Sequence, residues 1–169
     1  MTIALPRFDR STAAERGLTI ADFLVPVTVA ERLNTRVRDS LLVASGALFI
    51  YLTSLLVVPH EPVPWTGQTF GVLVVGGALG LRRGFLAVAL YVLLGYIGLP
   101  FFAEHKSGAS VILGATGGYL IGFIVAGAVV GRLAELGWDR RFGGAIGMML
   151  IGSVIIYAIG LPWLEPSRT

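Results

Sequence analysis

The chain has 169 residues, of which 55% are hydrophobic and only 14% charged, against about 25% charged residues in an average soluble domain. Its mean hydropathy is +0.81, so a disordered chain is excluded and an ordinary soluble globule is disfavoured, because too few charges exist to cover the apolar surface. The absence of cysteine excludes disulfides, zinc–thiolate sites and a thiol nucleophile.

Residues 1–27 are expected to form a cytoplasmic tail or a segment that lies on the membrane surface. Charged residues interrupt any hydrophobic core that a signal peptide would need. Thr28 and Glu31 have the spacing of a capping box, in which a hydroxyl and a carboxylate each bind a free backbone N–H group. This spacing predicts that the first helix begins near residue 29 and that the folded region covers residues 28–164.

Five apolar stretches follow, and none contains Asp, Glu, Lys or Arg. They are residues 40–59, 67–81, 84–103, 109–131 and 142–163. A helix needs about 20 residues to cross ~30 Å of hydrocarbon, and the second stretch reaches this only if Arg82 and Arg83 extend toward the interface. The pattern predicts an all-α polytopic membrane protein with five transmembrane helices and a short tail at residues 165–169.

The basic residues predict the orientation of the chain in the membrane. Eleven lie before the first span, after the second or after the fourth, whereas only Lys106 and Arg168 lie on the other side. Because lysine and arginine are enriched in cytoplasmic loops, the N-terminus is predicted to be cytoplasmic. The same bias explains the net charge of +3 without a nucleic-acid partner.

Small residues recur at four-residue spacing, which allows helix backbones to approach closely in lipid. One row contains Gly76, Gly80 and Gly84, and the others are Gly114, Gly118, Gly122 and Ala126, and Gly143 and Gly147. Each row favours packing within the bundle, and the alternative is a docking face for another membrane subunit. Three small residues in the first span are candidates for such docking: Ser40, Ala44 and Ala47.

The sequence lacks the residues of most membrane chemistries. It has no phosphate-binding loop, only two histidines, and no ionisable Asp, Glu, Lys or Arg inside a predicted span. An enzyme, a proton-coupled pump and a voltage-gated channel are therefore disfavoured, and no cofactor is expected. A binder, a pore or a scaffold remains.

Neutral polar and aromatic residues gather at the predicted outer ends of the spans. Trp65 and Thr66 precede the second span, Gln68 opens it, and Thr116 and Tyr119 lie at the start of the fourth. These types are also usual in interfacial belts and helix caps, which is the alternative interpretation. Together they favour a largely apolar small molecule with an amide-like head group.

Several motifs resemble those of the BioY family, the biotin-specific substrate-binding (S) subunits of energy-coupling-factor (ECF) transporters. The resemblance covers residues 37–164 and rests on six segments in the family's order. They are Val63-Pro-Trp-Thr-Gly-Gln-Thr69, Leu81-Arg-Arg-Gly84, Tyr91-Val-Leu-Leu-Gly-Tyr-Ile-Gly-Leu-Pro100, Gly114-Ala-Thr-Gly-Gly-Tyr-Leu-Ile-Gly122, Trp138-Asp-Arg-Arg141 and Ile155-Ile-Tyr-Ala-Ile-Gly-Leu-Pro-Trp163.

The resemblance implies capture of biotin from the outer side of a bacterial plasma membrane. It also implies a transmembrane T subunit that contacts small residues of the first helix, and two cytoplasmic ATPases that drive release inward. From the matched motifs and their place on the outer face, the residues expected at the ligand are Trp65, Thr66, Gln68, Tyr91, Thr116, Gly117, Gly118 and Tyr119.

The sequence departs from the family pattern in two places. Family members have a sixth helix that opens with Pro-Gly-Asp and then a lysine, and this sequence is expected to lack that helix. It also reads Ser153 where an asparagine is common, and Lys106 is the residue that could replace the missing cation. Two alternatives therefore stay open: an S subunit for another vitamin, and a truncated membrane scaffold that does not transport.

Overall fold

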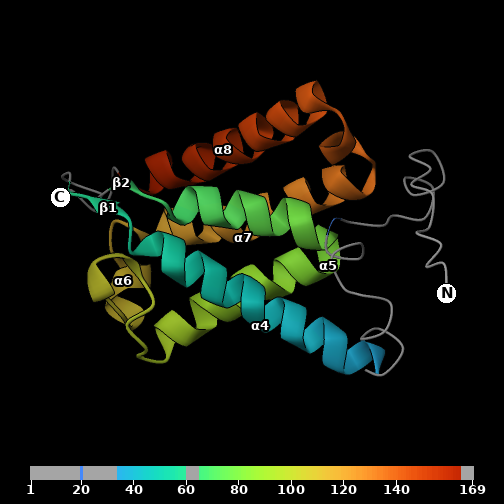
Figure 1. Ribbon diagram of the computed structural model, residues 1–169. Helices are drawn as coiled ribbons and strands as arrows, with labels where there is room; N and C mark the ends of the chain where they lie inside the picture. The colour runs from blue at the N-terminus through green and yellow to red at the C-terminus, as the bar shows by residue number, and fades with distance from the viewer. Residues whose placement is uncertain (1–19, 21–33, 60–64, 165–169) are drawn as a thin grey trace, which may run out of the picture.

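The computed structural model describes residues 20, 34–59 and 65–164, and within them helices dominate (Figure 1). Apart from Ile20, the predicted tails, residues 1–27 and 165–169, and the capping box at 28–31 lie outside these residues. The elements are α4 (Thr35–Ser54), β1 (Val57–Val58), β2 (Trp65–Thr66), α5 (Gln68–Tyr96), the 3₁₀ turn η1 (Ala103–His105), α6 (Ala109–Leu113), α7 (Gly117–Glu135), the 3₁₀ turn η2 (Trp138–Arg140) and α8 (Phe142–Leu164).

Helix α5 is a hairpin and not a straight rod. Gly80 interrupts it with φ 82° and ψ −178°, a conformation essentially restricted to glycine. Gln68 Nε2 lies 2.5 Å from Tyr91 Oη, although a straight helix would separate these residues by about 35 Å. Residues 68–79 and 81–96 therefore run antiparallel, as Figure 1 shows. With these two arms, the described chain contains the five predicted spans.

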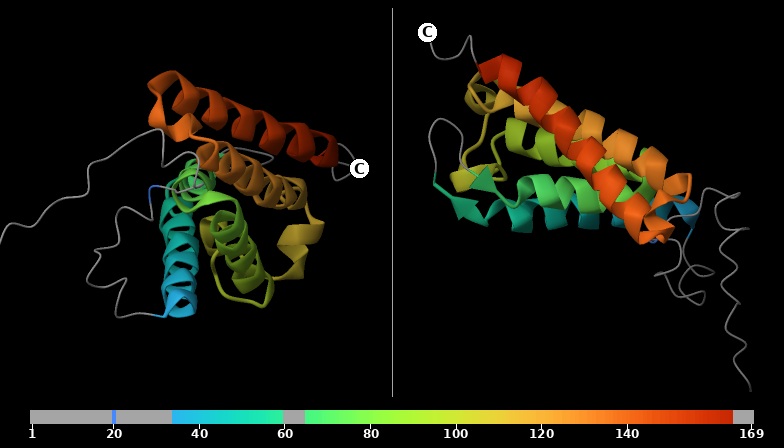
Figure 2. Two further views of the ribbon diagram at one scale, coloured as in Figure 1. Left: turned by 90° about the vertical axis from the view of Figure 1, so that its right-hand side faces the viewer. Right: turned by 90° about the horizontal axis from the view of Figure 1, so that it is seen from above.

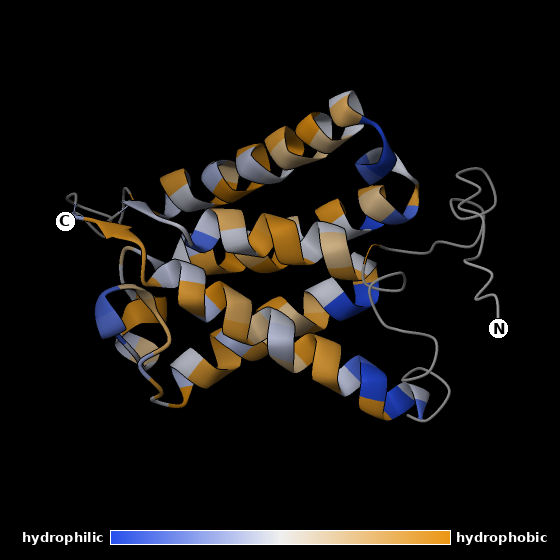
Figure 3. Cartoon of the chain, viewed as in Figure 1, coloured by the Kyte–Doolittle hydropathy of each residue, from blue (hydrophilic) through white to orange (hydrophobic). Residues whose placement is uncertain are grey.

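The helices pack in the order α4, α5, α7 and α8 (Figure 2). Four of the described helices, α4, α5, α7 and α8, are long and apolar enough to cross a membrane. Hydrophobic residues dominate them (Figure 3), and many of their large apolar side chains are exposed. The chain is accordingly a multi-pass membrane protein. The hydropathy pattern locates the spans, whereas their breaks and several of their ends differ from the prediction.

The fourth predicted span, residues 109–131, is divided into α6 and α7. Gly114 adopts an extended conformation with φ −85° and ψ −167°, which ends α6. At the break the Gly114 carbonyl accepts two hydrogen bonds, from the Gly117 N–H group at 3.1 Å and from the indole Nε1 of Trp163 at 3.1 Å. The break therefore turns the segment before Gly117 away from the axis of α7 without leaving that carbonyl unpaired.

The ends of the first and third predicted spans also differ from the prediction. Helix α4 begins at Thr35, after Asn34, whose side chain accepts from the Arg36 N–H group. It ends at Ser54 rather than near residue 59, because Val57 and Val58 pair antiparallel with Thr66 and Trp65. The third span ends at Tyr96 rather than at residue 103.

The basic residues gather at one end of the bundle, as the orientation prediction requires. The start of α4 meets the turn of α5 through Arg83 Nε and Asp39 Oδ1, 3.0 Å apart. The end of α7 reaches the same turn, where the Leu81 N–H group donates to Glu135 Oε1 at 2.9 Å. We call this the arginine end, and the opposite end, with β1, β2, η1 and α6, the outer end.

Glycines allow the helix backbones to touch. A Cβ atom at Gly76 would lie 2.8 Å from the Gly127 carbonyl oxygen, and one at Gly122 would lie 3.0 Å from Ile156 Cα. These contacts confirm bundle packing for the first two predicted rows. In the third row, a Cβ atom at Gly143 would meet nothing within 4 Å.

Replacing Gly80 should destabilise the fold. In Gly80→Ala, a side chain is forced into positive φ, which costs about 1–3 kcal/mol. We expect a lower unfolding temperature in detergent, measured by scanning fluorimetry. Gly143→Ala is the matched control, because open space surrounds that position, and it should melt like the parent chain. Equal melting of all three proteins would contradict the hairpin constraint.

Candidate functional site

A cavity of about 320 Å³ lies at the outer end of the bundle. Its wall comes from β2, the start of α5, η1, the start of α7 and the last turns of α8. This volume is at the lower end of the range for small-molecule sites. The lining residues are all uncharged: Trp65, Thr66, Gln68, Thr69, Ala103, Thr116, Tyr119, Phe123 and Tyr157.

Five of the eight residues predicted at the ligand line this cavity. They are Trp65, Thr66, Gln68, Thr116 and Tyr119. The segments that carry them are distant in sequence and meet because the α5 hairpin and α7 both have ends here. Hydroxyl and amide groups thus face a space otherwise bounded by aromatic rings.

Tyr91 lies behind the cavity wall, where it holds Gln68 in place. The Gln68 side chain is 3% exposed, and its Nε2 donates to Tyr91 Oη at 2.5 Å. The Tyr91 hydroxyl in turn donates to the Phe101 carbonyl at 2.8 Å, which also accepts from Ser54 Oγ at 3.2 Å. This chain of hydrogen bonds fixes which part of the Gln68 amide faces the cavity, so Tyr91 is a positioning residue.

Gly117 and Gly118 do not line the cavity, and their small size serves packing. A Cβ atom at Gly117 would overlap the Ile112 carbonyl oxygen, and one at Gly118 would lie 2.3 Å from Trp163 Cβ. These glycines let α6 and the end of α8 close around the start of α7. In the structure the space beside both glycines is occupied by neighbouring helices, and their predicted contact with a ligand stays a prediction.

Aromatic rings form the apolar side of the cavity. The rings of Tyr119 and Tyr157 are 6.1 Å apart and almost perpendicular, a favourable edge-to-face arrangement. Phe123, 3% exposed, lies one turn further along α7. Trp65 is 69% exposed and is among the residues that line the cavity.

Four lining residues were not predicted: Thr69, Ala103, Phe123 and Tyr157. Phe123 could have been found, because it follows Tyr119 by four residues and shares its helix face. Thr69 adjoins Gln68. The positions of Ala103 and Tyr157 depend on how η1 and α8 pack, which no local pattern indicates.

Lys106, the predicted replacement for the missing cation, does not line the cavity. Lys106 is exposed and pairs with the carboxylate of Glu104 in the adjacent turn. The described wall therefore offers hydroxyl and amide hydrogen bonds but no ion pair. Nor do the described residues contain a group of three His, Cys, Asp or Glu side chains that could hold a metal ion.

The predicted docking residues are only partly accessible. Ser40 and Ala44 are exposed on α4, whereas Ala47 is 1% exposed and belongs to the core. The three residues recur at three- to four-residue spacing, so the sequence places them on one side of the helix. The packing of α4 on α5 buries the last of them, so Ala47 cannot take part in a surface that Ser40 and Ala44 present.

The sequence model of the BioY family matches residues 26–166. The biotin transporter BioY of Thermotoga maritima is 48% identical over 104 residues, which are 62% of this chain and 60% of that protein. The biotin transporter BioY2 of Lactococcus lactis subsp. cremoris is 36% identical over 133 residues, or 78% and 72% of the two chains. This chain thus spans less than two thirds of the Thermotoga protein.

A solved structure supports the same relationship. The crystal structure of the S-component for biotin from an ECF-type ABC transporter aligns with a TM-score of 0.73 and 27% sequence identity. The alignment covers 80% of this chain and 77% of that one. The helical bundle is therefore shared with that protein at the level of the fold.

Removing the Tyr91 hydroxyl should destabilise the outer end. In Tyr91→Phe the buried Gln68 amide loses its acceptor, and an unsatisfied buried polar group costs about 1–3 kcal/mol. We expect a lower unfolding temperature in detergent. Tyr96→Phe is the control, because Tyr96 is 50% exposed on the same arm of α5. Similar melting of the two variants would show that the hydrogen-bond chain contributes nothing.

Proposed function

The chain belongs to the BioY family, and on that basis we propose that it is a biotin-binding S subunit of an ECF transporter. It would take biotin from the outer side of a bacterial plasma membrane, with its N-terminus in the cytoplasm. The observation that carries this proposal is the uncharged outer cavity, whose polar groups are one amide and several hydroxyls. No covalent chemistry is proposed for this chain.

Biotin matches the cavity chemically. Its ureido ring both donates and accepts hydrogen bonds, as the Gln68 amide and the hydroxyls of Thr66 and Thr116 do. Its thioether and aliphatic chain suit the rings of Tyr119 and Phe123. The ureido ring is best accommodated beside buried Gln68, which leaves the valerate carboxylate toward the opening. A carboxylate is costly to bury without a cation, and the described wall has none.

Partner subunits would supply the energy for transport. The chain has no phosphate-binding loop, so ATP hydrolysis would belong to two ATPase subunits coupled through a transmembrane T subunit. Ser40 and Ala44 are exposed on α4 and are the predicted docking positions that remain accessible. The aligned solved structure is itself named as a component of an ECF-type transporter.

Two substitutions test the cavity directly. Gln68→Ala and Tyr119→Ala should each weaken biotin binding about tenfold, the effect of losing ~1.4 kcal/mol of hydrogen bonding or ring contact. Isothermal titration in detergent measures this, with Tyr96→Ala as an exposed control. Gln68→Ala should weaken the binding of biotin amide by the same factor as the binding of biotin, since the two molecules have the same ureido ring.

Unchanged affinity in both variants would remove these residues from the site. Riboflavin, thiamine and folate should fail to displace labelled biotin. Displacement by one of them at equal concentration would assign the cavity to that vitamin instead.

Uptake tests the proposed partners. Cells that express this chain with T and ATPase subunits should accumulate tritiated biotin, and cells with ATPases inactivated in the phosphate-binding loop should not, because inward release requires hydrolysis. If the purified chain binds biotin but the complete set of subunits gives no uptake, the chain is a binding protein without transport activity.

A further inference from the structure

A second hollow opens on the side of the bundle, between α4 and the returning arm of α5. Its volume is about 770 Å³, and it is separate from the outer cavity, with which it shares no lining residue. We call it the lateral groove. Its lining residues are Arg36, Asp39, Ser40, Val43, Arg82, Arg83, Leu86, Ala89, Leu90 and Leu93.

The groove is charged at one end and apolar along the rest of its length. The charged residues lie at the arginine end, and Val43, Leu86, Ala89, Leu90 and Leu93 continue from them toward the outer end. From Arg82 to Leu93 the helix rises about 16 Å. One leaflet of a ~30 Å hydrocarbon core is about 15 Å deep, so the apolar part of the groove matches the depth of a single leaflet.

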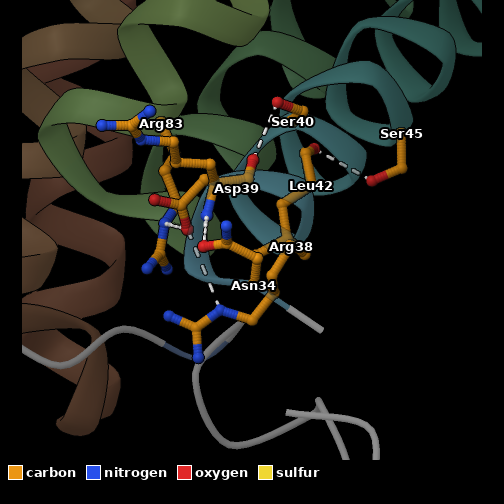
Figure 4. Close-up of polar contacts among 8 residues, drawn as sticks. Asn34, Arg38, Asp39, Ser40, Leu42, Ser45 and Arg83 are labelled. Carbon is orange, nitrogen blue, oxygen red and sulfur yellow. Dashed lines mark hydrogen bonds and ion pairs between the residues drawn. The ribbon is translucent and has the colours of Figure 1, made fainter. Parts of the chain in front are cut away.

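The charges at the arginine end do not cancel. Asp39 lies between Arg83 and Arg38 (Figure 4), with its Oδ1 3.0 Å from Arg83 Nε and 3.8 Å from Arg38 Nε. The single carboxylate of the groove is thus already paired. Arg36 and Arg82 are both exposed, and neither guanidinium has an ion-pair partner among the described residues. An excess of positive charge therefore faces the groove.

We propose that the lateral groove binds one anionic phospholipid of the cytoplasmic leaflet. Arg36 and Arg82 contact the phosphate and head group, and one acyl chain lies along Leu86, Ala89 and Leu93. A lipid meets both requirements of the groove, a negative charge at one end and a flexible apolar chain of leaflet length. Arginine suits this role because its planar guanidinium donates two parallel hydrogen bonds to phosphate oxygens.

Native mass spectrometry of the full chain tests the proposal. The protein in neutral detergent is incubated with phosphatidylglycerol or with phosphatidylcholine of the same acyl chains. We expect one phosphatidylglycerol to be retained at about ten times the occupancy of phosphatidylcholine. The double variant Arg36→Gln/Arg82→Gln should reduce this retention to the phosphatidylcholine level, and Ala89→Trp should reduce it by filling the groove while leaving every charge in place.

Arg132→Gln/Arg141→Gln is the matched control, since it removes two exposed arginines of the same end that do not line the groove. It should retain the lipid, and the unfolding temperature of every variant in detergent reports that the bundle is folded. Equal retention of the two lipids, or equal loss in both double variants, would overturn the proposal. So would a dimer that Ala89→Trp abolishes, which would assign the groove to a second copy of the chain.

Discussion

The turn at Gly80 is the constraint on which the other features depend. It returns residues 81–96 beside residues 68–79, so that Tyr91 reaches Gln68 at the outer end. At the arginine end, the same turn brings Arg83 to Asp39 of α4 and the Leu81 N–H group to Glu135 of α7. A Cβ atom at Gly131 would lie 2.5 Å from the Gly80 carbonyl carbon. The turn therefore requires glycine both for its own backbone and on the helix packed against it.

Close packing replaces the hydrophobic driving force that lipid does not supply between helices. Along the seam of α7 and α8, Gly118 accommodates Trp163, and Gly160 accommodates the ring of Tyr119. The second of these contacts has a consequence for the outer cavity. Because a larger residue at 160 would collide with the Tyr119 ring, the glycine helps to determine where that ring stands in the cavity wall. Packing and recognition therefore share residues at the outer end.

The sequence was sufficient to predict the helical membrane fold, the spans and most of the cavity wall, because each depends on hydropathy or on residues near helix ends. Trp65, Thr66, Gln68, Thr116 and Tyr119 could be named as a group for this reason. The break at Gly114 was not predicted, since one of the two donors to its carbonyl, the Trp163 indole, is 49 residues away.

The sequence also could not predict which neighbouring residue covers a given side of a helix. Ala47 is small and correctly spaced, yet α5 covers it. Gly117 and Gly118 belong to a matched motif, yet the space they leave is filled by Ile112 and Trp163. In each case a residue type was identified correctly, but the neighbour that occupies its free side comes from another helix, and only the tertiary structure shows which neighbour that is.

The distribution of charge explains why the two hollows differ in character. Charged side chains are expensive within the hydrocarbon region, and the described spans place theirs at the arginine end. The cavity at the opposite ends of these helices is lined by neutral donors and acceptors, which are the groups that a bound molecule would meet there. The lateral groove begins where arginines can reach the interface, so it can hold a full negative charge. The returning arm of α5 contributes to both hollows, with Tyr91 behind the cavity wall and Arg82 in the groove. The polar groups of the two hollows differ, neutral in the cavity and charged in the groove.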